Sequence, residues 1–136
     1  IAKDRNIHIR EVRSGEAGAF QTLMTLTVQT ENQTRSLAGT LFNEESRLVR
    51  IKGIPIDAKL GPHMLYITNR DKPGLIGALG TLLGDAGINI ATFHLGRADE
   101  GGDAIALIET DGPTPPDLLV KITALEHVVT AVPMTF

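Results

Sequence analysis

The hydrophobic positions in the second half of the chain follow two different periods. From Leu75 to Ala86 apolar residues recur at intervals of three and four, which predicts a helix with one buried face. A second helical pattern follows Thr114. Four apolar runs typical of strands surround these helices, at 64–68, 88–97, 104–110 and 128–136. The order βαββαβ is that of a ferredoxin-like unit, in which an antiparallel sheet carries both helices on one face.

Each predicted helix presents one apolar face to this sheet. Thr114 is expected to cap the second helix, with Pro115 in its first turn, and Pro73 to stand in the first turn of the first helix. The expected buried residues are Leu75, Ile76, Leu79, Leu82, Leu83 and Ala86 in the first helix, and Leu118, Leu119, Ile122 and Leu125 in the second. The opposite face of the first helix carries three glycines, which fit either a close neighbour or open solvent.

The two edges of the predicted sheet differ in their protection. Such a sheet has the strand order 4-1-3-2, so the strands at 128–136 and 88–97 lie at its edges. Pro133 suits an edge because proline has no N–H to give to a neighbouring strand. The strand at 88–97 begins with an apolar run that has neither Pro nor Lys, and an unprotected edge favours pairing with a second chain. We therefore expect a homodimer through this strand.

The first half of the chain has the alternating pattern of a β-meander. Strands are predicted at 7–12, 23–28, 36–42, 47–51 and 54–60, with the end of a helix at 1–4 and a loop at 14–18. No complete helix covers their apolar faces, so we expect a cover from residues upstream of Ile1 or from a partner chain. Because Gly61 and Pro62 mark a break, the chain is predicted as α+β, with a mostly β partial domain at 1–62 and a ferredoxin-like domain at 63–136.

Composition excludes several classes of function. The chain has no Cys and no Trp, and only 4% of its residues are aromatic, which argues against disulfides, thiol chemistry and base stacking. The net charge of −3 argues against nucleic acid as a partner, and no apolar run is long enough to cross a membrane. The lack of Cys favours the cytoplasm, and a start at Ile1 rather than Met predicts a fragment or a processed chain.

No pattern in the chain indicates catalysis or a metal. The glycines at 74, 77, 80 and 84 lie within a predicted helix and do not form a dinucleotide fingerprint after a strand. The four histidines have no carboxylate or Cys at catalytic or ligand spacing. We therefore expect no catalytic residue, no metal site and no bound cofactor within these 136 residues.

The candidate binding site is the turn that joins the strand at 64–68 to the first helix. Free amides from Gly74 to Gly77, together with the helix dipole, favour a carboxylate or phosphate at this point. Asn69 and Asp71 stand just before it, and a carboxylate beside free amides suits the ammonium and carboxylate of an amino acid. Helix capping by Asp71 is the simpler interpretation, and the sequence leaves both open.

Basic residues gather in the first half, and they include Arg47 and Lys59. Two interpretations stand beside each other: a solvated strand face, or a site for an anion such as phosphate.

These residues resemble a known family. The segment Met64-Leu-Tyr-Ile-Thr-Asn-Arg-Asp-Lys-Pro-Gly-Leu-Ile-Gly, followed by Leu82-Leu-Gly-Asp-Ala-Gly-Ile-Asn-Ile-Ala, is similar to the ACT domain, and more closely to the C-terminal ACT domain of the D-3-phosphoglycerate dehydrogenase family. Leu37-Ala-Gly-Thr-Leu-Phe and Arg47-Leu-Val-Arg-Ile-Lys-Gly-Ile-Pro-Ile-Asp resemble the allosteric substrate-binding domain before it in long-form members. The two resemblances cover nearly the whole chain.

The resemblance implies a regulatory function. In this family L-serine is a feedback inhibitor held between two ACT domains. The matching positions here are Asn69 and Asp71 in the first loop and Asn89 at the start of the strand at 88–97. We expect the carboxylate of serine at the amides near Leu75 and Ile76, and Asn89 to reach in from the partner chain, because it begins the shared edge strand. The resemblance also implies that Arg47 and Lys59 bind phosphate or a phosphorylated substrate, and that NAD-dependent catalytic domains lie upstream.

Two other functions fit the same pattern. The regulatory part of an iron–sulfur L-serine dehydratase resembles this pair of domains too. A stand-alone module for amino-acid binding or assembly would need no attached enzyme. Residues upstream of Ile1 would distinguish the three functions.

Overall fold

The computed structural model describes residues 7–12 and 22–136, which form two antiparallel four-stranded sheets and two helices. The first sheet is a meander of strands in chain order, β1 (Leu23–Gln29), β2 (Thr34–Phe42), β3 (Glu45–Ile51) and β4 (Ile54–Lys59). The rest of the chain forms β5 (His63–Arg70), α1 (Leu75–Asp85), β6 (Ile90–Arg97), β7 (Asp103–Thr110), α2 (Pro116–Thr123) and β8 (Val128–Thr135). The predicted α+β class, with a mostly β region before a ferredoxin-like unit, is confirmed.

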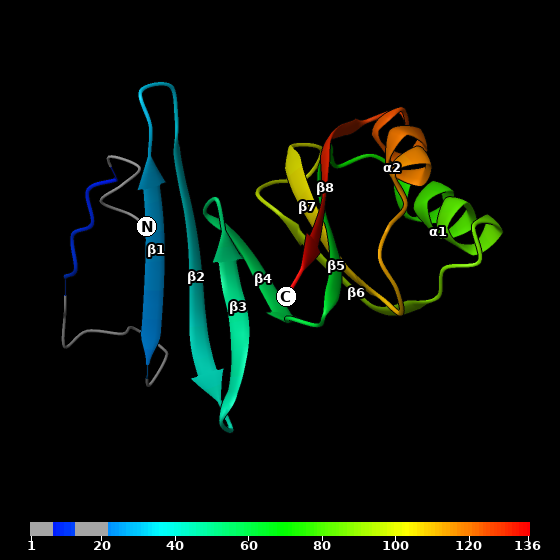
Figure 1. Ribbon diagram of the computed structural model, residues 1–136. Coiled ribbons are helices and arrows are strands. Elements are labelled where there is room, and N and C mark those ends of the chain that lie inside the picture. The colour runs from blue at the N-terminus through cyan, green and yellow to red at the C-terminus, as the bar shows by residue number, and fades with distance from the viewer. Residues whose placement is uncertain (1–6, 13–21) are drawn as a thin grey trace.

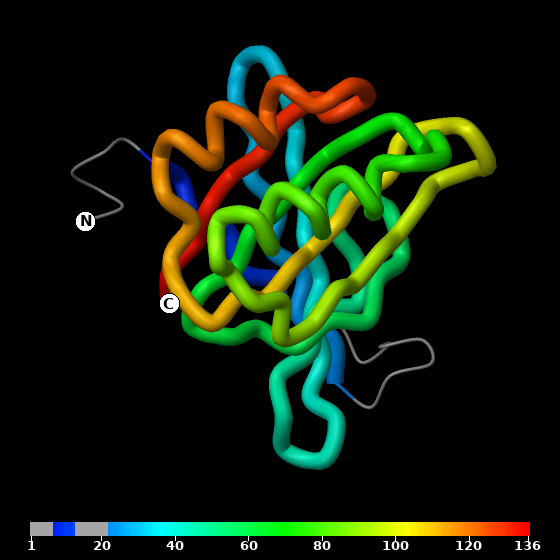
Figure 2. The backbone as a smooth tube through the Cα atoms, turned by 90° about the vertical axis from the view of Figure 1, so that its right-hand side faces the viewer, coloured from blue at the N-terminus to red at the C-terminus, as the bar shows by residue number. Residues whose placement is uncertain are grey.

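The second sheet has the predicted topology. Its strand order is β6-β7-β5-β8, which is the expected 4-1-3-2 read from the other side, and all its pairs are antiparallel. Both helices lie on one face of it, with the first sheet on the other (Figure 1), and Figure 2 shows the two helices in front of the strands. β8, with Pro133, is one edge of this sheet, and β6 is the other.

The main core lies between the second sheet and its helices. It contains Leu65 and Ile67 from β5, Ala106 and Ile108 from β7, Leu75, Leu79 and Leu83 from α1, and Leu118 and Ile122 from α2. The helix residues of this core are among those that the helical period predicts. Ile76 and Ala86 were also expected there, and this was wrong: Ile76 is 53% exposed, and Ala86 is the exposed C-cap of α1. Ile76 is rotated about 100° from Leu75 around the helix axis, which takes it past the edge of the buried stripe.

A second buried cluster joins the two sheets. Residues of β4 pack on the face of the second sheet that the helices leave free, and the cluster consists of Ile54, Ile56, Ala58, Met64, Ile105 and Leu107. The approach is close at Gly96 of β6, where a Cβ atom would lie 2.4 Å from the carbonyl oxygen of Pro55. The second sheet thus covers the β3–β4 half of the meander, whereas every residue of β1 is exposed. What covers β1 stays a prediction.

Several local expectations were wrong. Residues 7–12 form no strand, because an alternating pattern supplies a face but not a neighbouring strand to pair with. α1 begins after Pro73, since Gly74 is its N-cap with a left-handed φ of 95°, a conformation that glycine adopts without strain. α2 likewise starts one residue late, with Pro115 rather than Thr114 at the cap. The predictions for residues 1–4 and 14–18 lie outside the described residues.

Candidate functional site

Asp71 lies between β5 and α1, and the residues at the loop of the β6–β7 hairpin hydrogen-bond to it. Its Oδ2 accepts hydrogen bonds from Arg97 Nη1 and from the Gly101 amide, each at 3.2 Å. Its own amide donates to the Gly102 carbonyl at 2.9 Å. The pKa of Asp71 lies below the usual aspartate value, first because of the Gly101 amide and then because of Arg97. Within the part of the chain that the structure describes no side chain caps α1, so the capping interpretation of Asp71 was wrong.

The start of α1 leaves amides for a ligand. The first helical hydrogen bond runs from the Ala78 amide to the Gly74 carbonyl at 3.0 Å, so the amides of Leu75, Ile76 and Gly77 precede the intrahelical ladder. Leu75 is buried in the core, and it could meet a ligand only through its backbone N–H. The helix dipole adds partial positive charge at this point, which suits a carboxylate.

Asn69 is the second side chain next to this turn. It lies within β5 rather than in the loop where we expected it, since the strand continues to Arg70. Asn69 continues the alternation of Leu65 and Ile67 on the helix-facing side of the sheet. Its Nδ2 donates to the Arg70 carbonyl at 2.9 Å, whereas its buried Oδ1 has no hydrogen-bond partner among residues 7–12 and 22–136. An unpaired buried oxygen is costly, and a donor that reached Oδ1 would remove this cost.

Asn89 is at the other end of the sheet. It directly precedes β6, which starts at Ile90 and not at the predicted Ile88. Its Nδ2 donates to Asp111 Oδ2 at 2.9 Å, and the Asp111 amide donates to its carbonyl at 3.2 Å. Ile90 pairs with Thr110, whereas Arg97, at the Asp71 end, pairs with Ala104. β6 separates the two ends by about 23 Å at 3.3 Å per residue, so one protomer does not bring Asn89 to Asp71.

Arg47 and Lys59 face each other across β3 and β4 as register partners. Each already has a carboxylate: Arg47 Nε lies 2.6 Å from Asp57 Oδ1, and Lys59 Nζ lies 2.7 Å from Glu45 Oε1. The pKa of Glu45 is lowered, mainly by its hydrogen bond from Lys59. The structure therefore brings the two cations together, but their charge is balanced locally.

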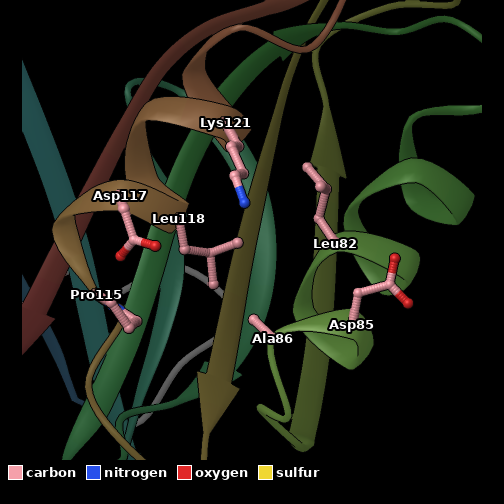
Figure 3. Close-up of a pocket in the computed structure, with 7 residues that line it drawn as sticks. All are labelled: Leu82, Asp85, Ala86, Pro115, Asp117, Leu118 and Lys121. Atoms are coloured by element: carbon pink, nitrogen blue, oxygen red, sulfur yellow. The ribbon is translucent and has the colours of Figure 1, made fainter.

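Two hollows lie outside the turn of β5 and α1, and of the residues predicted for serine they include Asn69. A cavity of about 310 Å³ lies between α1 and α2, lined by Leu82, Asp85, Leu118 and Lys121 among others (Figure 3). Another of about 290 Å³ lies between the sheets, and Lys52, Thr68 and Asn69 are among its lining residues. Among residues 7–12 and 22–136, no group of acidic or histidine side chains is arranged to hold a metal ion. No helix in the same part of the chain is long and apolar enough to span a membrane.

Two family models match the chain side by side. Residues 1–52 match the D-3-phosphoglycerate dehydrogenase intervening domain, and residues 63–127 match the ACT domain. The chain matches the regulatory region of the D-3-phosphoglycerate dehydrogenase family. Similar proteins of this name include those of Archaeoglobus fulgidus (32% identical, 96% of this chain), Bacillus subtilis (32%, 95%) and Synechocystis (34%, 90%). The alignments take in 25%, 25% and 22% of these proteins, so the chain spans about a quarter of their length.

Three residues of the site were not found by sequence reasoning. Asp71 is hydrogen-bonded by Arg97 and by the Gly101 amide, which lie 26 and 30 positions further along the chain. Asn89 is hydrogen-bonded to Asp111, 22 positions further along. The hairpin at 99–102 was predicted, and it places the neighbouring Arg97 close to the turn. A charged residue next to a predicted tight hairpin was the available signal.

Proposed function

We propose that this chain binds L-serine between two ACT domains and so regulates an attached, NAD-dependent D-3-phosphoglycerate dehydrogenase by feedback. The observation that carries the proposal is the turn of β5 and α1, where Asp71 stands beside the first amides of a helix. A carboxylate next to free amides complements the two charges of an amino acid. Asn69 and Asp71 would meet the ammonium of serine, and the amides near Leu75 and Ile76 its carboxylate.

Asn89 enters this site only from a second copy. Two β6 edges paired about a two-fold axis run antiparallel, so the Asn89 end of one strand lies beside the Arg97 end of the other. The partner's Asn89 then stands near Asp71. A ligand held by both chains favours the paired arrangement by its difference in affinity, which is how it would bias the catalytic domains.

Calorimetry with L-serine tests this proposal directly. Saturable binding of one serine per ACT domain is the expected result. No heat with millimolar serine would remove the ligand assignment and would leave an assembly module or a sensor of another amino acid. If the chain were instead the regulatory part of an L-serine dehydratase, the same serine binding would be expected. The two alternatives differ in the reaction that the whole protein catalyses.

The proposed dimer makes a prediction about one exposed edge residue. Leu95 lies on β6 and is 52% exposed, so Leu95→Lys places a positive charge on both edges that are to pair. Like charges on facing strands destabilise their pairing. We expect the mass from light scattering at micromolar concentration to fall from a dimer toward a monomer, and serine binding to weaken with it.

The matched control uses the opposite edge. Val129 lies on β8 and is 57% exposed, so Val129→Lys adds the same charge at an edge that the proposal leaves out. Its mass should stay that of a dimer. A mass change in the Val129 variant, or an unchanged mass in the Leu95 variant, would assign the contact to another surface.

A second site for an anion is proposed at Arg47 and Lys59, because β-sheet register places these two cations opposite each other. An anion such as phosphate would replace the carboxylates of Asp57 and Glu45 as their partner. Arginine supplies a two-pronged donor and lysine a point charge. We expect phosphate titration to shift NMR signals of β3 and β4 in the wild type, and not in Arg47→Ala/Lys59→Ala. Equal shifts in both proteins would place phosphate elsewhere.

A further inference from the structure

The three side chains proposed to meet the ligand share one property: each already uses its other polar atom within the protein. Asn69 donates through Nδ2 to a backbone carbonyl, and Asn89 donates through Nδ2 to a carboxylate. Oδ2 of Asp71 accepts hydrogen bonds from Arg97 and the Gly101 amide. Each is left with a single oxygen, the Oδ1. Three oxygens are the complement of a primary ammonium, which has three N–H donors and no acceptor.

The orientation of the Asn89 amide depends on one neighbour. An asparagine side chain presents either a donor or an acceptor, according to the hydrogen bonds around it. A carboxylate such as that of Asp111 accepts hydrogen bonds, so Nδ2 of Asn89 is the atom that faces it, at 2.9 Å. The Asp111 amide also bonds to the Asn89 carbonyl, which fixes the two residues relative to each other. Asn89 Oδ1 is therefore turned away from Asp111.

We propose that Asp111 is a positioning residue of the amino-acid site: it fixes the Asn89 amide so that Oδ1, and not Nδ2, faces the ammonium of a ligand held by the partner subunit. This rests on the proposed serine site. Without Asp111 the amide is free to turn, and half of its orientations point two N–H groups at a cation. Asp111 itself touches no ligand and acts only through Asn89.

The test is a double-mutant cycle in which the affinity for L-serine is measured by NMR titration, so that weak binding stays measurable. Asp111→Asn keeps the size of the side chain but can donate as well as accept. We expect it to weaken serine binding by about 3- to 10-fold, the range of one hydrogen bond. In an Asn89→Ala background the same substitution should change the affinity by less than about 2-fold, since contacting residues that act through each other are not additive. The matched control is Asp117→Asn, which removes an exposed carboxylate on α2. It should leave the serine affinity unchanged in both the wild-type and the Asn89→Ala backgrounds.

The outcomes separate the inference from the function on which it rests. Equal losses with and without Asn89 would mean that Asp111 acts by another route, and an unchanged affinity in Asp111→Asn would mean that it does not orient the amide. Either result overturns the inference while serine binding to the wild type still supports the proposed function. A wild type that binds no serine overturns both.

Discussion

Replacing Asp71 with Asn should weaken L-serine binding by about 2–5 kcal/mol, the usual cost of removing one partner from a charge pair enclosed at an interface. Asp71 is the only carboxylate that the proposal places against the ammonium. Its side chain is 32% exposed in one protomer, and a partner chain on the β6 edge would cover it further. Calorimetry on the wild type and the variant measures the difference.

The control must separate lost charge from a disturbed turn. Asp85→Asn removes a carboxylate from the far end of α1 and should leave the affinity unchanged. Hydrogen exchange at the Gly101 amide shows whether the β6–β7 hairpin still closes on residue 71. Unchanged serine affinity in Asp71→Asn would remove Asp71 from the site.

The pH dependence of binding follows from the same contacts. The Gly101 amide and then Arg97 lower the pKa of Asp71, so the carboxylate stays ionised below the usual aspartate pKa of about 4. Serine affinity should therefore be constant between neutral pH and about pH 5 and should fall only as Asp71 takes up a proton below that range. The lowered pKa also adds stability that is present above the unfolded-state pKa and is lost as the pH falls through the folded-state pKa.

Gly96→Ala should lower the free energy of unfolding by about 1–3 kcal/mol, because the new methyl group has no space between the sheets. Its Cβ would lie 2.4 Å from the Pro55 carbonyl oxygen and 3.0 Å from Ile54 Cγ2. A backbone atom of β4 cannot turn aside as the end of a long side chain can. The sheets must therefore separate near the Ile54 end of the second core cluster. Chemical denaturation measures the loss.

Gly80→Ala is the matched substitution with the opposite expected sign. Gly80 lies within α1, and a Cβ atom there would meet no other part of the described chain within 4 Å. Alanine is favoured over glycine inside a helix by about 1 kcal/mol, so this variant should be more stable than the wild type. An equal loss of stability in both variants would mean that the tight contact at Gly96 is not the cause of the loss in Gly96→Ala. It would also mean that a neighbour packs on the glycine face of α1.

The fold could be predicted from the sequence because the apolar residues of its main helices and strands recur with the period of that kind of element. Leu75, Leu79 and Leu83 recur every four residues and form the buried face of α1, and Pro133 marks an edge. At residues 7–12 the alternating pattern predicted a strand wrongly, because a pattern does not show whether a neighbouring strand is present to pair with. The exact helix starts depended on single φ angles, such as that of Gly74, which no spacing reveals.

The site could be predicted only in part. Asp71 and the helix start are close in sequence, so local reasoning found them. The bonds that hold Asp71 come from Arg97 and Gly101, and tertiary folding alone brings these residues to it. The same holds for Asp111 and Asn89, which meet because β6 and β7 pair in one particular register.

The placement of Asp71 and Asn89 at opposite ends of β6 has a consequence for mass action. A protomer alone offers half of each proposed serine site, whereas a two-fold pair contains two complete ones. Ligand binding and self-association are then linked equilibria: serine tightens the dimer, and dilution below the dimer dissociation constant lowers the apparent affinity for serine. In the proposed regulation, the concentration of the protein would thereby become a second input, alongside the concentration of the amino acid.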